Sequence, residues 1–151
     1  MKTPLGSMSA EFTARGLARL SFVRDGDSAD VAPPGRGDGA RLRVLLRELE
    51  AYFASGRAGF TVPLDLSSGT AFDQEVWGAL MRIPSGETRT YGEVARAVGR
   101  PRAARAVGLS CGRNPVAVVV PCHRVTASRG PGGYGPGLAL KRRLLELEGA
   151  C

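Results

Sequence analysis

An apolar run closed by a proline constrains this chain more than any other feature. Residues 116–120 read Val-Ala-Val-Val-Val, and four β-branched residues among five predict a short buried strand. Pro121 has no N–H to donate to a ladder, so it ends the strand and places Cys122 on the turn that follows. His123, the only histidine among 151 residues, comes next. The chain therefore sets a thiol beside its one imidazole.

Cys122 and His123 have the residue types of an activated nucleophile. The thiolate is the reactive form of cysteine, and a neighbouring imidazole or cation favours it; His123 and Arg124 offer one of each. In a continuous strand Cys122 and His123 would point to opposite faces, so they cooperate only if the chain turns here or a water joins them. The alternative is a small buried cysteine beside a structural histidine, which are the usual roles of these residue types.

Length and cysteine usage narrow the class of protein. At 151 residues the chain forms one domain of ordinary size or two small ones. Three cysteines, Cys111, Cys122 and Cys151, with one histidine and no CxxC spacing, support neither a disulfide framework nor a metal site. No run approaches the ~18 apolar residues of a membrane span, and the N-terminus lacks the apolar core of a signal peptide. We therefore expect a cytoplasmic protein that contacts no membrane.

The net charge of the chain indicates what kind of molecule it could bind. The formal net charge is +7, from 21 Lys and Arg residues against 14 Asp and Glu. Such an excess favours a polyanionic partner such as nucleic acid. A GC-rich genome would also favour arginine, so composition alone leaves nucleic-acid binding open.

Residues 1–65 predict a small N-terminal α+β scaffold domain. Residues 5–23 hold two alternating segments around a glycine turn, which predicts a hairpin, and residues 25–40 form a polar loop. Apolar residues at helical spacing over 42–53 predict a helix, and residues 60–62 predict a short strand. No residue of this domain carries chemistry.

Residues 66–151 predict a helix-turn-helix domain of winged-helix-like character, so the fold class is α+β. Thr70 can cap a first helix that Pro84 ends. Residues 90–93 form a capping box that opens a second helix. A third helix is predicted over 102–110, after a proline at its first position, and a short turn joins the second helix to the third.

The last segment combines a glycine-rich loop with a helix. Residues 138–148 place leucines on one face and predict a packed C-terminal helix. Residues 130–135 match GxGxxG by letters, but they do not open a helix directly and have no βαβ context. A flexible loop that walls a pocket fits better than a dinucleotide site.

The third predicted helix has side chains suited to a duplex. Arg102 and Arg105 are three residues apart and share a helical face, while Ala103 and Ala104 are small enough to let a nucleic-acid backbone approach. The alternative is a solvated arginine pair on an ordinary alanine-rich helix.

Taken in order, the motifs of this chain resemble one known family. The matching segments are PLG near the start, VPLDLSSGTAFDQEVW, IPSGETRTYGEVA, RPRAARAVG, NPVAVVVPCHRV, GYGPG and LKRRLLELEG. They resemble the O6-alkylguanine-DNA alkyltransferases, which are also called methylated-DNA–protein-cysteine methyltransferases. PCHRV with the upstream NP and RAVG is highly specific at this spacing, while the N-terminal third matches loosely.

The resemblance implies DNA repair by direct reversal. The protein would transfer the alkyl group from O6-alkylguanine, and from O4-alkylthymine, in double-stranded DNA to its own cysteine. The transfer would be irreversible, with a single turnover, no cofactor and no metal, and the protein would act as a monomer. The target nucleotide would be flipped out through the minor groove, because guanine O6 cannot meet a protein thiol inside the stack.

The resemblance also assigns catalytic roles. Cys122 would be the alkyl acceptor, and His123 would deprotonate it through a water. Glu148 would orient the imidazole, Asn114 would brace the turn, and Tyr91 would donate to guanine N3.

Substrate and DNA contacts follow from the same likeness. The substrate-binding positions are Val125, Tyr134 and Gly135, of which Val125 and Gly135 act through the backbone. The DNA-binding positions are Arg102, Ala103, Ala104 and Arg105. Arg105 would fill the space that the flipped-out nucleotide leaves in the duplex.

The chain departs from the family pattern at two points, and two other functions are possible alternatives. Pro136 interrupts the usual family pattern GYxGG, and the loop before Tyr134 is one residue shorter, so the pocket rim and its range of bulky alkyl groups are expected to differ. A non-enzymatic damage binder of the alkyltransferase-like kind would lack Cys122. A winged-helix regulator would instead use Cys122 as a redox sensor, dimerise and recognise specific sequences.

Overall fold

The computed structural model describes residues 1–24, 38–57 and 59–150. It has the mixed α+β composition that the sequence predicts. Cys151 and most of the loop expected over residues 25–40 lie outside the described residues. Across the described part of the chain, no helix has the length and apolar character needed to cross a membrane.

The chain divides into two compact units. The first comprises Met1–Leu66 and Pro115–Ala117, and the second comprises Ser67–Asn114 and Val118–Cys151. The segment Pro115–Ala117 thus belongs to the first unit although the second surrounds it in sequence.

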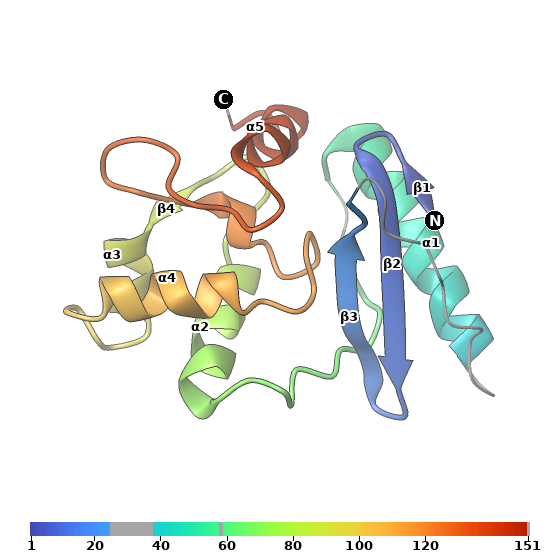
Figure 1. Cartoon of the computed structure of the whole chain (residues 1–151), viewed down its shortest axis with the longest axis horizontal. Helices are drawn as coiled ribbons and strands as arrows, with labels where there is room; N and C mark the ends of the chain where they lie inside the picture. The colour runs from blue at the N-terminus through green and yellow to red at the C-terminus, as the bar shows by residue number, and fades with distance from the viewer. Residues whose placement is uncertain (25–37, 58, 151) are drawn as a thin grey trace. The chain divides into compact units, whose positions relative to one another are not determined.

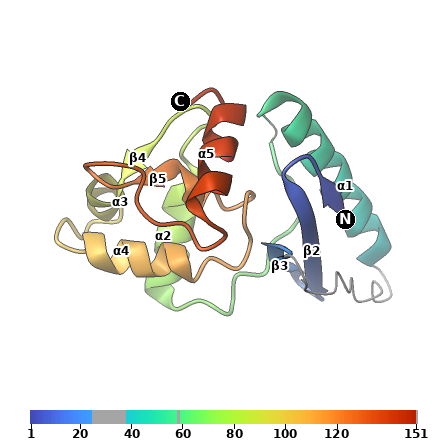
Figure 2. The ribbon, with the colours of Figure 1, turned by 45° about the horizontal axis from the view of Figure 1, so that its top comes forward.

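The first unit is an antiparallel sheet with one helix. Strands β1 (Lys2–Thr3), β2 (Gly6–Thr13) and β3 (Gly16–Phe22) pair in that order, and β2 with β3 forms the predicted hairpin (Figure 1). Helix α1 (Asp38–Ser55) lies beside β1 and β2 in both views (Figures 1 and 2). The fully or nearly buried side chains include Met8, Leu17, Leu20, Leu45, Leu49, Tyr52 and Val62.

The strand expected over residues 60–62 is wrong. The backbone N–H groups of Thr61 and Val62 donate to the carboxylate of Glu48, at 2.6 and 3.0 Å. A side chain of α1 therefore takes the donors that a ladder would have used, and the chain pairs with β3 only two residues later, in an isolated bridge between Leu64 and Leu17.

The second unit holds most of the helices. Its elements are α2 (Ala71–Met81), β4 (Arg89–Thr90), α3 (Tyr91–Ala97), α4 (Ala104–Gly112), the 3-10 helix η1 (Cys122–Arg124), β5 (Val125–Thr126) and α5 (Leu138–Leu147). Helices α3 and α4 form the expected helix-turn-helix, and α4 also packs against α2. The short strands β4 and β5 pair in parallel and lie side by side in Figure 2.

Two helices begin at the residues that the sequence indicates. Thr70 caps α2 in a capping box with Asp73, and Thr90 caps α3 in a capping box with Glu93. In each box the threonine hydroxyl accepts from the third backbone N–H, at 3.1 Å, and the acidic side chain accepts from the cap backbone.

The predicted boundaries of α4 and α5 need correction. Helix α4 begins at Ala104 and runs to Gly112, because the N–H of Ala103 closes a turn on the carbonyl of Arg100 and delays the helix. The predicted start at residue 102 is therefore two residues early. Helix α5 ends at Leu147, one residue before the predicted end.

The strand expected over residues 116–120 is also wrong. Val116 forms an isolated bridge to Leu20, and turns follow it, with Val118 at φ 70°. The carbonyl of Val120 accepts from the side-chain amide of Asn114 and from the N–H of Cys122, each at 2.8 Å. The residues are buried as predicted, but the ladder is limited to the bridge at Val116, where the N–H of Ala117 donates to the carbonyl of Leu20 at 2.9 Å.

A buried carboxylate joins the start of α2 to the end of α4. Asp73 is 1% exposed and accepts from Ser110 Oγ at 2.6 Å and from Arg113 Nη2 at 2.7 Å. The Arg113 guanidinium, helped by Ser110 and Thr70, outweighs burial and holds the pKa of Asp73 well below its usual range. Asp73 is therefore ionised under all ordinary conditions.

Asp73→Asn tests this joint. The variant should lose about 1.5–3 kcal/mol of unfolding free energy at pH 7, the range for hydrogen bonds to charged groups. Because the pKa of Asp73 is lowered by folding, the wild type has this stabilisation above pH ~4 and loses it as the pH falls further. Denaturant titrations at pH 7 and near pH 3 should show the difference between the two proteins narrowing. Glu75→Gln, an exposed change on the same helix, is the control and should match the wild type at both pH values.

Candidate active site

Cys122 lies at the start of η1, where the chain turns. Cys122 is buried, with 8% of its surface exposed. The N–H of Arg124 donates to the carbonyl of Pro121 at 3.0 Å and closes the turn. The 3-10 turn removes the strand alternation that would have sent Cys122 and His123 to opposite faces. The chain therefore turns at the point where cooperation between Cys122 and His123 requires it to turn.

Asn114 is the hydrogen-bond partner of the thiol. Its Nδ2 lies 3.2 Å from Cys122 Sγ and also donates to the carbonyl of Val120. Burial raises the pKa of the Cys122 thiol, while the Asn114 bond and the charge of Lys141 act in the opposite direction. Cys122 therefore rests as a thiol, and a base must remove its proton when it reacts.

His123 and Glu148 form a fully buried pair. His123 Nε2 lies 3.0 and 2.9 Å from the two carboxylate oxygens of Glu148, and His123 is 0% exposed. Burial alone would raise the pKa of Glu148, but hydrogen bonds from His123 and Arg124 bring it to about 2. An ionised carboxylate only accepts, so Nε2 carries the imidazole proton.

The other ring nitrogen of His123 is left as a base. Burial lowers the pKa of His123 in spite of the Glu148 bond, so the ring is neutral at physiological pH. With the proton fixed on Nε2, Nδ1 has a free lone pair, and it finds no hydrogen-bond partner among the described residues. Nδ1 is the atom that can accept a proton, directly or through a water.

Arg124 has a different role from the one the sequence suggested. Its Nε donates to Glu148 at 2.7 Å and its Nη1 donates to the carbonyl of Ile83 at 2.6 Å. The guanidinium is thus engaged with the carboxylate behind the imidazole. The expectation that Arg124 acts beside the Cys122 thiol is corrected accordingly.

Tyr91 begins α3 and meets the glycine-rich loop. A Cβ placed on Gly132 would lie 2.8 Å from the Tyr91 hydroxyl, so the loop backbone packs directly on this side chain. Burial, and then the charge that Cys111 would carry, raise the pKa of Tyr91, and a bond from the Gly133 backbone acts against them. The hydroxyl therefore stays protonated and able to donate.

The other predicted substrate positions lie along the same loop. Val125 is fully buried at the start of β5, and its carbonyl accepts from Lys141 Nζ at 2.6 Å. Tyr134 is half-buried and Gly135 is exposed. Lys141, on α5, was missed by sequence reasoning, because an interior lysine on a leucine-rich helix reads as a solvent-facing residue.

The predicted DNA contacts are brought together only in part. Arg105 is exposed on α4, Ala103 is its N-cap residue, and Ala104 is its first residue. Arg102 is exposed in the preceding turn, so it does not share a helical face with Arg105 as expected.

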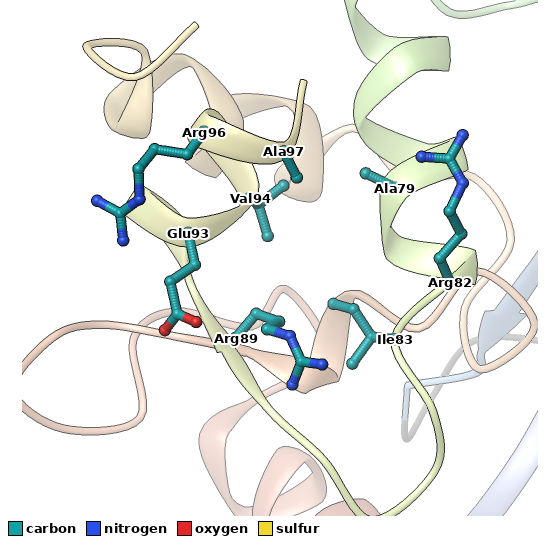
Figure 3. A pocket seen from close by; sticks show the side chains of 8 residues that line it. All are labelled: Ala79, Arg82, Ile83, Arg89, Glu93, Val94, Arg96 and Ala97. Atoms are coloured by element: carbon teal, nitrogen blue, oxygen red, sulfur yellow. The ribbon is translucent and has the colours of Figure 1, made fainter. Parts of the chain in front are cut away.

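A hollow of about 590 Å³ lies between α2 and α3, apart from these residues. Its lining comprises Ala79, Arg82, Ile83, Arg89, Glu93, Val94, Arg96 and Ala97 (Figure 3). Figure 3 shows the guanidinium groups of Arg82, Arg89 and Arg96 pointing in different directions. They do not converge on a single point as the donors of an anion site would.

Fold and site together define a thiol group-transfer protein built on an α+β fold with a helix-turn-helix. Residues 71–150 match the family described as 6-O-methylguanine DNA methyltransferase, DNA binding domain. The methylated-DNA–protein-cysteine methyltransferase of Methanosarcina acetivorans is 43% identical over 151 residues, which is 99% of this chain and 96% of that protein. The protein of the same name from Mycobacterium tuberculosis is 54% identical over 116 residues, 76% of this chain and 67% of that protein.

Solved structures agree. A crystal structure of Mycobacterium tuberculosis OGT in complex with DNA superposes with a TM-score of 0.86 at 42% identity, covering 99% of this chain and 91% of that one. The O6-methylguanine-DNA methyltransferase of Pyrococcus kodakaraensis gives 0.64 at 30% identity, covering 95% and 99%. The chain belongs to the 6-O-methylguanine DNA methyltransferase family. The resemblance drawn from its motifs is confirmed, and so is the enzyme class, a single-turnover methylated-DNA–protein-cysteine methyltransferase.

Gly132→Ala tests the contact between the loop and Tyr91. The added Cβ would lie 2.8 Å from the hydroxyl and 3.1 Å from the N–H nitrogen of Ala127, at φ +73°, so loop and ring must separate. Displacements of about 1 Å can slow a reaction on the order of 10²-fold, and we expect methyl transfer from O6-methylguanine DNA to slow by roughly 10–100-fold.

Gly130→Ala is the matched control. Gly130 also has a positive φ, +100°, but nothing lies within 4 Å of its Cβ position. Single-turnover transfer rates should be near wild type for this variant. An equal loss in both variants would mean that backbone strain, and not contact with Tyr91, sets the rate.

Proposed function

We propose that this chain repairs DNA by moving the alkyl group of O6-alkylguanine to Cys122. The alkylated nucleotide of a double-stranded substrate is flipped out through the minor groove, and O4-alkylthymine is accepted as a second substrate. The first unit is a scaffold, and the second carries both DNA contact and chemistry, in a monomer that needs no cofactor.

The reaction is a direct displacement. The Cys122 sulfur attacks the alkyl carbon, the bond from that carbon to guanine O6 breaks, and a thioether forms. The thiol proton passes to His123 Nδ1 through a water, and Tyr91 donates to guanine N3 as negative charge develops on the departing base. The thiol loses one proton and the restored guanine, still part of the DNA, takes up one proton at N1 through these groups and water, so no external reactant is consumed.

One observation carries this proposal most strongly. Glu148 fixes the His123 proton on Nε2, which leaves Nδ1 as a buried neutral base in the residue next to a protonated thiol. Asn114 already donates to Sγ at 3.2 Å, so a donor is in place for the thiolate as it forms. Val125, Tyr134 and Gly135 supply the rim that reads the base.

DNA contact is assigned to the start of α4. Ala103 and Ala104 are small, which lets the helix approach a duplex, and the exposed Arg105 fills the vacated stack. Arg102, in the preceding turn, meets phosphate.

Mass spectrometry after incubation with O6-methylguanine DNA tests the acceptor. One added methyl group should appear on the peptide that contains Cys122 and on no other, because Cys111 has no base beside it and burial raises its pKa to about 12. Cys122→Ser should bind the DNA but take up no methyl, since a hydroxyl is far harder to ionise. A methyl group on Cys111 or Cys151 would refute the assignment.

Arg105→Ala tests base flipping. Unstacking a nucleotide takes a few kcal/mol, so losing the side chain that refills the stack should slow repair of duplex DNA by roughly tenfold or more. Transfer from the free base should be nearly unchanged. Arg102→Ala is the comparison. It should weaken DNA binding and make that binding less dependent on salt, without a special loss of transfer from the flipped base in duplex DNA. Equal losses on duplex and free base for Arg105→Ala would contradict the role.

A further inference from the structure

Lys141 is a buried ammonium group held by carbonyl oxygens. It lies on α5 and is 1% exposed. Its Nζ donates to the carbonyls of Val125 and Pro131, each at 2.6 Å, and of Gly133 at 3.0 Å. These bonds use all three of its donors, and no carboxylate of the described residues forms an ion pair with it.

The three carbonyls belong to the walls of the candidate site. Val125 directly follows η1, the turn that starts with Cys122, whereas Pro131 and Gly133 flank Gly132, which packs on Tyr91. One ammonium therefore ties both ends of the loop to α5. Releasing it would free the loop that contacts Tyr91 and the backbone that follows the nucleophile.

The charge of Lys141 also reaches the thiol. Burying an ammonium without a counter-charge is unfavourable, and burial lowers the pKa of Lys141. Negative charge on Cys122 and Cys111 acts in the opposite direction, and the Lys141 charge in turn lowers the pKa of Cys122. Lys141 Nζ binds the carbonyl of Val125, three residues after Cys122, so a negative charge on the Cys122 sulfur would interact favourably with this ammonium.

We propose that Lys141 is a positioning residue with an electrostatic role: it holds the 125–133 backbone in the shape that receives the alkylated base, and its positive charge stabilises negative charge on Cys122 Sγ. The first part rests on the proposed function. The second concerns the protein alone and is testable without DNA.

The other titratable groups around Cys122 define what must be held constant. Tyr91 faces it from α3, Cys111 from α4 and His123 from its own turn, with Glu148 paired behind the imidazole. A change at Lys141 leaves these residues in place, but it also removes a charge that lowers the pKa of Cys111 and of His123, so modification of Cys111 is followed beside that of Cys122.

Lys141→Met removes the charge and keeps most of the length of the side chain. Lys141→Arg keeps the charge, but its planar donor group cannot reproduce three diverging bonds. Arg142→Met, an exposed change next to Lys141 on α5, removes one charge and is the control. Each protein is treated with iodoacetamide over a range of pH, and modification of Cys122 is followed by mass spectrometry. Each protein is also reacted with increasing concentrations of O6-methylguanine DNA. The dependence of the transfer rate on DNA concentration gives the half-saturating concentration and the maximal rate separately.

For Lys141→Met we expect the midpoint of Cys122 modification to move to higher pH and the maximal transfer rate to fall by roughly tenfold or more. Lys141→Arg should keep the wild-type midpoint and still transfer more slowly. Arg142→Met should match the wild type in both measurements. An unchanged midpoint in Lys141→Met would overturn the electrostatic role, and an unchanged transfer rate would overturn the positioning role.

Circular dichroism decides whether each variant folds. If Lys141→Met is unfolded, Lys141→Arg alone tests the proposal, since a moved midpoint with the charge retained would overturn it. Failure of the wild type to transfer from DNA would refute the proposed function, while the iodoacetamide midpoints would still test the charge.

Discussion

The carboxylate of Glu148 is the interaction on which the site depends. It accepts from His123 Nε2 and from Arg124 Nε, and Arg124 passes the connection on to the carbonyl of Ile83 after the end of α2. Because Glu148 stays ionised, it decides which imidazole nitrogen is the base, and because it caps α5 it ties the last helix to the reactive turn. A neutral residue here would leave Arg124 buried without its counter-charge and would free the imidazole to change tautomer.

Features set by neighbours in sequence could be predicted. The capping boxes of Thr70 and Thr90 join residues that are three apart in sequence, and the hairpin turn between β2 and β3 is equally local. The local sequence is therefore enough to predict them. The place of Cys122 on a turn was also predicted, although turns already begin after Val116 and not at Pro121. The joining of Cys122, Asn114, His123 and Glu148 in one unit was expected from the family motifs and not from spacing, because Glu148 is 25 residues from His123.

Features set by hydrogen bonds between side chains and backbone groups outside the local turn could not be predicted. Residues 60–62 have the composition of a strand, but the carboxylate of Glu48 takes their N–H groups. Residues 116–120 look like a core strand, yet Asn114 takes the Val120 carbonyl and the chain turns. Lys141 is the clearest case, because a lysine among leucines and arginines gives no sign of the three carbonyls that its ammonium binds.

The two reacting side chains, Cys122 and His123, are uncharged at rest, and this gives the hydrogen-bond donors and the positive charge around them their effect. Burial keeps Cys122 as a thiol and His123 neutral, so little charge is present at the sulfur until the alkyl group moves. Asn114 and Lys141 then meet a charge that exists mainly during the reaction, and interactions of that kind lower the barrier more than they tighten binding. In a site with a permanent thiolate, the same interactions would stabilise the ground state as much as the transition state. Such a thiolate would also be more easily oxidised. Burial that raises the pKa of the Cys122 thiol is therefore compatible with reaction, because the base and the hydrogen-bond donors act as the proton leaves.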